Sequence, residues 1–315
     1  MTKPLSLLAH CLLLVMSFTL STCNNVNDLQ APPQELVPEL VISVLRDSLP
    51  GAENIVFKTV EENKLWEATY KRQSQQYYSA INRTKIIATY KLLGDTVKSV
   101  LRQATDLVSL RNAQLSEFKE KERGGNMNVS EEFSSKYLFD NQSYLLTWVP
   151  AVGNSGRSYV MNLDKFSKFG FITLDMSDLP AAVQTFYQAR NLSHQGTKVY
   201  IGESNEKIFR SVGSVGSKSY EFIFDHAGRV IYSPYNITER YNALNLIPQF
   251  AQGYITAKKQ FEGFSLLSGE KFEEAGQVGY KFSLLKSTPF AESYFLFFDN
   301  SGNLKYLTYN VVTNF

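Results

Sequence analysis

Few side chains of this chain are of the kinds that perform chemistry. Two of its three histidines, His194 and His226, lie far from the N-terminus. His226 stands inside an Asp-x-x-Gly turn, where the residue types are favoured for backbone reasons, and His194 follows a predicted helix, where an imidazole can cap carbonyl groups. The sequence contains no nucleophile, metalloprotease or nucleotide-binding motif in its proper context. We therefore predict no catalytic residue and no cofactor.

Two aspartates raise the question of a metal site. Asp225 and Asp299 each open an Asp-x-x-Gly segment, and turns of this kind present oxygen atoms that calcium binds. Each turn provides one carboxylate, whereas calcium takes roughly six to eight oxygen ligands. Aspartate and glycine also favour tight turns without any ion, since the carboxylate accepts hydrogen bonds from the following backbone. We therefore interpret both segments as structural turns and predict no metal.

The two turns belong to a hairpin that the chain repeats. EFIFDHAGRVIYSPY at 221–235 returns as FLFFDNSGNLKYLTY at 295–309, and each copy is an apolar strand, a turn and a second apolar strand. A tyrosine lies five residues before the turn acid in both copies, and the same spacing occurs at two earlier places. The segment Tyr294–Phe298 is apolar on both faces, so we expect it to be covered on both. The predicted structural turn residues are Asn82, Asp164, Asp225, Gly228, Asp299 and Gly302.

A helix is predicted before each hairpin. Apolar residues recur at helical spacing after Pro38, Pro180 and Pro248, and proline is favoured at the start of a helix. A fourth periodic segment opens at Asp95–Thr96. Each helix and its hairpin leave room for two more strands, so we predict an α+β fold of tandem small modules, each one helix packed on a roughly four-stranded antiparallel sheet. The predicted modules span 36–94, 95–176, 177–238 and 239–315, with an insertion in the second near 120–132.

The first residues resemble the leader of a bacterial lipoprotein. A basic residue precedes an apolar run of signal-peptide length, which ends in Leu-Ser-Thr-Cys at Leu20–Cys23. The resemblance implies a signal peptide at 1–22 and a lipidated Cys23 as the new N-terminus. Cys23 is the first residue of a short polar tether that spans residues 23–35. The other cysteine, Cys11, lies inside the leader, which leaves no disulfide or zinc cluster in the mature chain.

Charge and aromatic residues narrow the range of partners. A formal net charge of +2 with no basic stripe is not the pattern of a nucleic-acid-binding protein. Beyond the leader, the sequence shows no segment long and apolar enough to span a bilayer. Trp66 and Trp148 lie on predicted inner strands. They either belong to the core, which is the favoured interpretation, or form part of an aromatic contact surface, so we keep them as candidate binding residues.

The third predicted module carries a further resemblance. Its segments SDLPAAVQTFYQARNLS, KVYIGES and KSYEFIFDHAGRVIY give a Leu-Pro-led helix, strands and a Phe-Asp-x-x-Gly hairpin. This outline is similar to that of PepSY-like and β-lactamase-inhibitor-protein-like domains of secreted bacterial proteins. The resemblance implies binding or inhibition of secreted peptidases and other extracytoplasmic proteins, and it carries no catalytic residue over to this chain.

Together these inferences predict a non-catalytic lipoprotein of the bacterial outer membrane. The protein is anchored by lipid and binds, or inhibits, an extracytoplasmic protein or peptidase. Two alternatives stay open: an envelope hydrolase whose site assembles from dispersed Asp, Glu and Tyr, and a structural accessory subunit of an outer-membrane complex. A deep polar cleft with two converging carboxylates would favour the hydrolase, whereas exposed aromatic surface where modules meet would favour binding.

Overall fold

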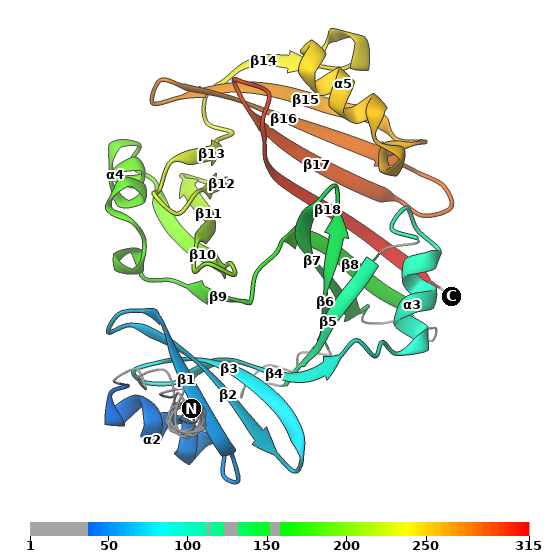
Figure 1. Cartoon of the computed structure of the whole chain (residues 1–315). Coiled ribbons are helices and arrows are strands. Elements are labelled where there is room, and N and C mark those ends of the chain that lie inside the picture. The colour runs from blue at the N-terminus through cyan, green and yellow to red at the C-terminus, as the bar shows by residue number, and fades with distance from the viewer. Residues whose placement is uncertain (1–36, 112–113, 123–131, 152–157, 315) are drawn as a thin grey trace, which may run out of the picture. The chain divides into compact units, whose positions relative to one another are not determined.

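The computed structural model describes residues 37–111, 114–122, 132–151 and 158–314 (Figure 1). The predicted signal peptide at 1–22, the lipidation site Cys23 and the tether at 23–35 lie outside the described residues, as does most of the insertion expected near 120–132. Within the described ranges, no helix combines the length and the hydropathy that crossing a membrane requires.

Four α-helices lie in the described part of the chain, and three of them begin directly after a proline. They are α2 (Glu39–Ser48), α3 (Ser99–Asp106), α4 (Ala181–Ala189) and α5 (Gln249–Ala257), with short 3₁₀ helices η1 (Met176–Asp178), η2 (Leu244–Leu246) and η3 (Lys259–Phe261). Pro38, Pro180 and Pro248 precede α2, α4 and α5 with φ angles of −57°, −54° and −52°. The proline ring thus holds the backbone near a helical φ before the helix starts. Helix α3 follows Lys98, later than the start at Asp95–Thr96 that the sequence favoured.

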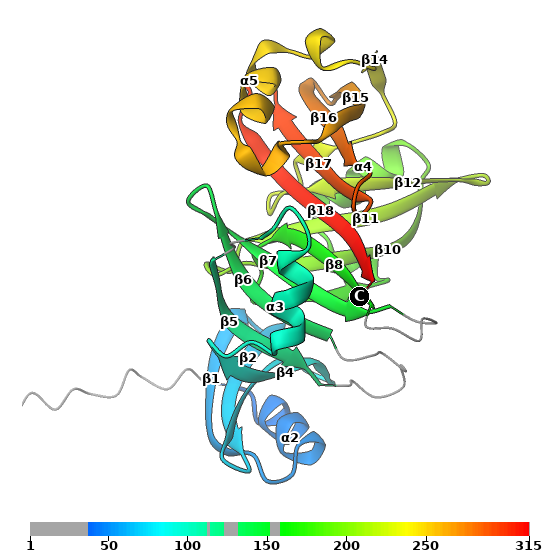
Figure 2. The ribbon, with the colours of Figure 1, turned by 90° about the vertical axis from the view of Figure 1, so that its right-hand side faces the viewer.

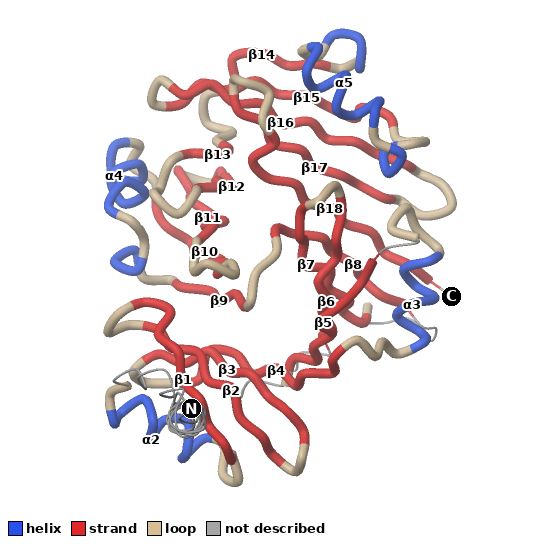
Figure 3. Tube along the Cα trace, viewed as in Figure 1, coloured by secondary structure: helices blue, strands red, loops and turns tan. Residues whose placement is uncertain are grey.

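Strands dominate the described part of the chain (Figure 3), with 55% of its residues in strands and 17% in helices, the 3₁₀ helices included. The first eight are β1 (Glu53–Glu61), β2 (Leu65–Arg72), β3 (Gln75–Asn82), β4 (Ile86–Gly94), β5 (Gln114–Lys121), β6 (Glu132–Phe139), β7 (Gln142–Pro150) and β8 (Ser158–Lys165). The next five are β9 (Phe169–Thr173), β10 (Ser193–Ile201), β11 (Lys207–Val215), β12 (Lys218–Phe224) and β13 (Val230–Tyr232). The last five are β14 (Ile237–Tyr241), β15 (Ser265–Glu274), β16 (Gln277–Lys286), β17 (Glu292–Asp299) and β18 (Leu304–Asn314).

The predicted fold of tandem modules, each with its own four-stranded sheet, is wrong. One antiparallel sheet of 13 strands has the order β1-β2-β3-β4-β5-β6-β7-β8-β18-β17-β16-β15-β14. Strand β4 continues it into β5, with Tyr90 opposite Lys121, and β8 continues it into β18, with Leu163 opposite Tyr309. The edge of a small sheet carries unpaired backbone N–H and C=O groups, and pairing with a neighbouring edge satisfies them. Hydrophobic periodicity marks the faces of strands but not the edges that pair, so it did not reveal this joining.

A second antiparallel sheet has five strands in the order β13-β12-β11-β10-β9. One of its faces packs against α4, where Val183 and Phe186 meet Phe222 and Phe224. Its other face packs against the thirteen-stranded sheet through Tyr200, Ile208, Ile223, Ile231 and Tyr232, which meet Phe272, Phe297 and Tyr306. By its contacts the chain from Pro38 to Phe315 forms one unit, and the module boundaries predicted within it stay a prediction.

Another core cluster joins α3 and α5 to the middle of the thirteen-stranded sheet (Figure 2). Leu101 of α3 and Ala251 of α5 belong to this cluster together with buried side chains of β5–β8 and β16–β18. Strand β17 contributes Tyr294, Leu296 and Phe298 to it, whereas Phe297 of the same strand faces the five-stranded sheet. The expectation that this strand is covered on both faces is therefore confirmed.

Candidate functional site

The two aspartate turns have the same internal geometry. Asp225 lies between β12 and β13, and its Oδ1 accepts hydrogen bonds from the backbone N–H of Ala227 (3.0 Å) and of Arg229 (2.9 Å). Asp299 lies at the end of β17, and its Oδ1 accepts from the N–H of Ser301 (3.0 Å) and of Asn303 (2.9 Å). Each carboxylate thus closes its own turn, which is what a turn-forming aspartate does.

Glycine completes both turns for a reason of backbone geometry. Gly228 has a φ of 79° and Gly302 a φ of 81°, in the left-handed region that side chains with a Cβ rarely adopt. A Cβ at Gly228 would also lie 3.0 Å from the Cβ of Ala182, and one at Gly302 would lie 2.9 Å from the ring of Phe250. The turns therefore need glycine both for their own conformation and for the helix that packs against each of them.

Of the two earlier turn candidates, one forms the predicted turn and the other does not. Asn82 behaves as expected, since its Oδ1 accepts from the N–H of Thr84 (3.0 Å) and of Lys85 (2.9 Å). Asp164 departs from the predicted turn, because it lies within β8 and is only 8% exposed. There it accepts hydrogen bonds from the hydroxyls of Tyr306 (2.6 Å) and Tyr200 (3.2 Å). A tyrosine lies five residues before Asp164, as it does before the turn acids of the two hairpins. The chain after β8 nevertheless continues to β9 instead of folding back into a hairpin.

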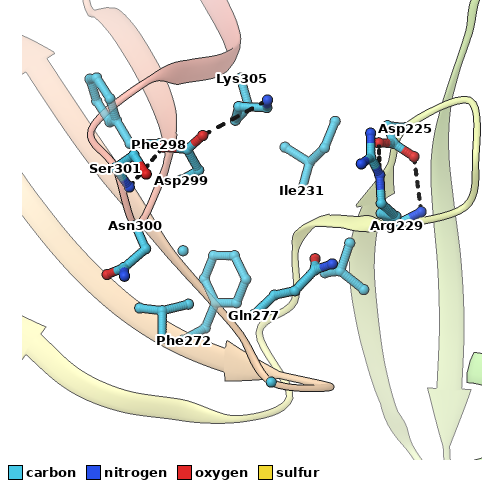
Figure 4. Close-up of a pocket in the computed structure, with 14 residues that line it drawn as sticks. Asp225, Arg229, Ile231, Phe272, Gln277, Phe298, Asp299, Asn300, Ser301 and Lys305 are labelled. Atoms are coloured by element: carbon cyan, nitrogen blue, oxygen red, sulfur yellow. Dashed lines mark hydrogen bonds and ion pairs between the residues drawn. The ribbon is translucent and has the colours of Figure 1, made fainter.

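The Asp225 and Asp299 turns line one pocket of about 360 Å³, which we name the turn pocket (Figure 4). Gly276, in the turn between β15 and β16, and Gln277, the first residue of β16, also line it. In the close-up, Ile231 lies between the two aspartate turns, and Phe272 lies near Gln277. The described lining is Asp225, Arg229, Val230, Ile231, Phe272, Gly276, Gln277, Val278, Gly279, Phe298, Asp299, Asn300, Ser301 and Lys305.

Each aspartate of the turn pocket has a cationic side chain nearby. Arg229 Nε lies 2.7 Å from Asp225 Oδ2, and Lys305 Nζ lies 3.9 Å from Asp299 Oδ2 (Figure 4). Burial opposes the ionisation of Asp299, but the hydrogen bonds from Asn303, the nearby Lys305 ammonium and the Ser301 amide outweigh it and lower the pKa. Asp299 is therefore held as a carboxylate and is poorly suited to donate a proton near neutral pH.

The groups of the turn pocket are suited to non-covalent binding. The described lining of the pocket contains no histidine, its lysine Lys305 lies 3.9 Å from Asp299 Oδ2, and the two aspartates accept hydrogen bonds from their own turns. Across the described residues, no group of three or more His, Cys, Asp and Glu side chains is placed to hold a metal ion. The chemistry available is hydrogen bonding from turn side chains together with apolar contact at Ile231 and Phe272.

The last strand of the five-stranded sheet borders the turn pocket. Val230 and Ile231 belong to β13, the edge strand of the five-stranded sheet, which pairs with β12 on one side. An edge strand carries backbone N–H and C=O groups that no neighbouring strand satisfies. Proteins use such edges to bind extended peptides, which add a strand by main-chain hydrogen bonds.

The tryptophans and histidines from the sequence lie elsewhere. Trp66 and Trp148 are 1% and 0% exposed, which is the core position that the sequence favoured for them, so they offer no contact surface. His194 lies within β10 and does not cap a helix, with Nδ1 3.2 Å from the carbonyl of Leu174 and Nε2 2.8 Å from Thr197 Oγ1. His226 is exposed in its turn.

Sequence reasoning missed the third wall of the turn pocket. The pair Ala275–Gly276 follows a glutamate-rich strand end and precedes an apolar strand, and a glycine there is a hairpin signal. That signal would have found the turn but not its nearness to Asp225 and Asp299, because the three turns meet only through packing of the two sheets.

Comparison with known proteins adds little to this geometry. No family model matches the chain, and no curated protein matches it either. One solved structure, of a Bacteroides vulgatus protein of unknown function whose place in the periplasm is itself an inference, is 17% identical. The match covers 44% of this chain and 98% of that protein, with a TM-score of 0.22, which is too low to support a shared fold or function. The resemblance to PepSY-like and β-lactamase-inhibitor-protein-like domains stays a prediction.

Proposed function

We propose that this protein is a non-catalytic binding protein of the bacterial cell envelope that captures an extended segment of an extracytoplasmic protein in the turn pocket. Lipid on Cys23 holds it at the outer membrane. A peptidase is one partner class that this mode of binding would serve, since a bound segment can block the partner's own site.

The observation that carries the proposal is the position of the turn pocket along β13, the last strand of the five-stranded sheet. A peptide laid against Val230 and Ile231 would add a strand to that sheet by main-chain hydrogen bonds. Its alternate side chains would meet apolar groups such as Phe272 and Val278 on one side and solvent on the other. Because Asp225 and Asp299 already have cationic partners, the pocket favours a peptide segment without a strong net charge.

The hydrolase alternative is less well supported by the same groups. A carboxylate pair that works as acid and base needs one group whose pKa is raised so that it keeps a proton. Asp299 is shifted in the opposite direction, and hydrogen bonds from its own turn hold it in place. Binding without catalysis is therefore the function that the geometry of the turn pocket supports best.

Filling the turn pocket is expected to abolish peptide capture. Gln277 and Ser301 are exposed residues of the lining, so Gln277→Trp and Ser301→Trp place an indole in the pocket without disturbing the core. Short random peptides displayed on phage would be selected on the wild-type mature protein, and their affinities measured by fluorescence anisotropy. We expect each Trp variant to weaken selected peptides by about a hundredfold or more, which is the loss of roughly 2.7 kcal/mol of binding free energy.

The matched control is Lys218→Trp, which adds the same side chain at an exposed position of β12, outside the turn-pocket lining. This variant should bind the selected peptides as the wild type does. Equal binding by Gln277→Trp and Lys218→Trp would place the peptide elsewhere and overturn the proposal. Turnover of a substrate panel by the purified protein, lost in an Asp299→Asn variant, would favour the hydrolase instead.

Removal of the lipid attachment point is expected to release the protein from the membrane. We expect the full-length chain to fractionate with outer membranes and to carry radiolabelled palmitate, because acyl chains add about 0.8 kcal/mol of membrane affinity for each buried methylene group. The Cys23→Ser chain should lose the label and appear in the soluble periplasmic fraction. The Cys11→Ser chain is the control, and an unchanged membrane fraction for Cys23→Ser would contradict lipid anchoring.

A further inference from the structure

A second pocket, of about 440 Å³, lies on other elements than the turn pocket and is mostly apolar. Its walls include Tyr78 of β3, Leu92 of β4, Phe118 of β5 and Phe166 from the segment between β8 and β9. Lys119 of β5 also lines it, and we name it the Lys119 pocket. Its volume lies in the range of small-molecule sites, roughly 300–1,000 Å³.

The Lys119 ammonium differs from its cationic neighbours in having no carboxylate partner among the described residues. Lys168 Nζ lies 3.0 Å from Glu67 Oε2, and Lys136 Nζ lies 2.5 Å from Glu203 Oε1 and 3.3 Å from Glu117 Oε1. For Lys119 Nζ the described contacts are a long hydrogen bond of 3.5 Å to the carbonyl of Lys168 and two aromatic rings. Lys119 is therefore the lysine of this group without a carboxylate in contact among the described residues, although Glu67, Glu117 and Glu203 balance the three lysines overall.

The surroundings of Lys119 make its charge costly. Its Nζ lies 5.8 Å from the ring centre of Tyr78 and 5.9 Å from that of Phe166. Burial among these groups lowers the pKa of Lys119, with the positive charges of Lys136 and Lys168 adding to the effect and Glu117 and Glu67 opposing it. An ammonium that has lost water without gaining an anion is stabilised by any ligand that brings one.

We propose that the Lys119 pocket binds an amphiphilic carboxylate, with the carboxylate on the Lys119 ammonium and the hydrocarbon part against Tyr78, Leu92, Phe118 and Phe166. A ligand with one negative charge suits Lys119, the lysine of this group without a contacting carboxylate among the described residues, whereas Glu117 and Glu203 in the lining would repel a doubly charged phosphate more strongly. The hydroxyl of Tyr78 is engaged, because it donates to Glu67 Oε2 at 2.8 Å, so Tyr78 offers its ring to the ligand. This site is independent of the proposed peptide capture.

The probe is dodecanoate, and calorimetric titration measures its affinity for the full mature chain carrying Cys23→Ser. This form needs no detergent, which would compete for an apolar pocket. We expect dodecanoate to bind below its critical micelle concentration, and Lys119→Met to weaken it by about tenfold or more through loss of the charged partner. Affinity should also fall as pH rises through the lowered pKa of Lys119, because the neutral amine no longer attracts a carboxylate.

Control measurements separate the contribution of the Lys119 charge from an effect on folding and from the contribution of the ligand's hydrocarbon tail. Lys218→Met removes an exposed lysine of β12 and should leave binding unchanged, while Lys119→Met should keep or raise the melting temperature, because it removes a buried charge. Dodecanol, with the same tail and no charge, should bind wild type and Lys119→Met equally and more weakly than dodecanoate binds wild type. No binding of dodecanoate, equal affinity of Lys119→Met, or dodecanol binding as tightly as dodecanoate would each overturn the proposal.

The same titration on Gln277→Trp distinguishes this proposal from peptide capture. Blocking the turn pocket should leave dodecanoate binding intact, since the two pockets share no lining residue. Loss of dodecanoate affinity in Gln277→Trp would show that the amphiphile occupies the turn pocket and would overturn the Lys119 site.

Discussion

Replacing Glu292 with alanine is expected to lower the free energy of unfolding by about 3–5 kcal/mol, the cost of breaking a buried ion pair by removing one partner. The side chain of Glu292 is 0% exposed, and its Oε1 lies 3.2 Å from Lys286 Nζ. Its Oε2 accepts hydrogen bonds of 2.8 Å from the backbone N–H of Ser109 and of 2.8 Å from the hydroxyl of Tyr309. Alanine would leave the Ser109 N–H and the Tyr309 hydroxyl without this acceptor and would remove the carboxylate partner of Lys286.

Glu292 has this large effect because it joins parts of the chain that are distant in sequence. Ser109 follows α3, whereas Glu292 and Tyr309 belong to β17 and β18. Lys286, at the end of β16, also donates to Ser109 Oγ at 2.9 Å, so the same loop is held twice. Loss of the carboxylate would therefore weaken the packing of α3 against the thirteen-stranded sheet. It would also weaken the contact between β17 and β18.

Urea unfolding followed by circular dichroism measures this change. Glu292→Gln keeps an oxygen acceptor without the charge and should fall between wild type and Glu292→Ala. Glu62→Ala, in the exposed turn between β1 and β2, makes the same substitution without a buried partner and should leave the midpoint unchanged. A change of less than about 1 kcal/mol for Glu292→Ala would mean that the surrounding donors find other partners.

Truncating Trp148 to alanine is expected to cost a similar amount, about 3–5 kcal/mol, because it leaves a large cavity in the core. Its side chain is 0% exposed and lies in the cluster between α3 and the thirteen-stranded sheet. The indole stacks near Phe118, with ring centres 6.2 Å apart, and Nε1 donates to Thr105 Oγ1 at 3.2 Å. Trp148→Phe keeps most of the volume and should cost less than half as much.

The same variant separates the two roles considered for this tryptophan. If Trp148 belongs to the core, Trp148→Ala lowers the unfolding midpoint, and peptide affinity of the folded fraction is unchanged. A contact residue would show the reverse, with lost affinity and an unchanged midpoint. Leu246→Ala serves as the control, because Leu246 is 58% exposed and its truncation opens no cavity.

Local features of the structure could be predicted from the sequence because short stretches of chain determine them. The starts of α2, α4 and α5 follow from proline at Pro38, Pro180 and Pro248, whose ring restricts the backbone of that residue itself. The turns at Asp225 and Asp299 follow from a carboxylate that reaches the next few amides. In each case the residues that interact are close together in the sequence.

The joining of strands into one sheet could not be predicted in the same way. Backbone hydrogen bonds between β8 and β18, where Leu163 lies opposite Tyr309, involve groups that every residue carries. Asp164 shows a related limit: the spacing that marks a turn in the other copies also suits a strand residue that accepts hydrogen bonds from two tyrosines. The turn pocket and the Lys119 pocket depend on such long-range packing, so both required the structure.

The place of β18 in the large sheet has a consequence for the order of events during synthesis. Strand β18 pairs with β17 on one side and with β8 on the other, and it is made after both. Until the ribosome has added residues 304–314, β8 and β17 lack the strand that pairs with both of them. Each then has an unpaired edge that can pair with another nascent chain. A chaperone that shields these edges would have its greatest effect at that stage, and premature termination before residue 304 should yield aggregates rather than a smaller folded protein.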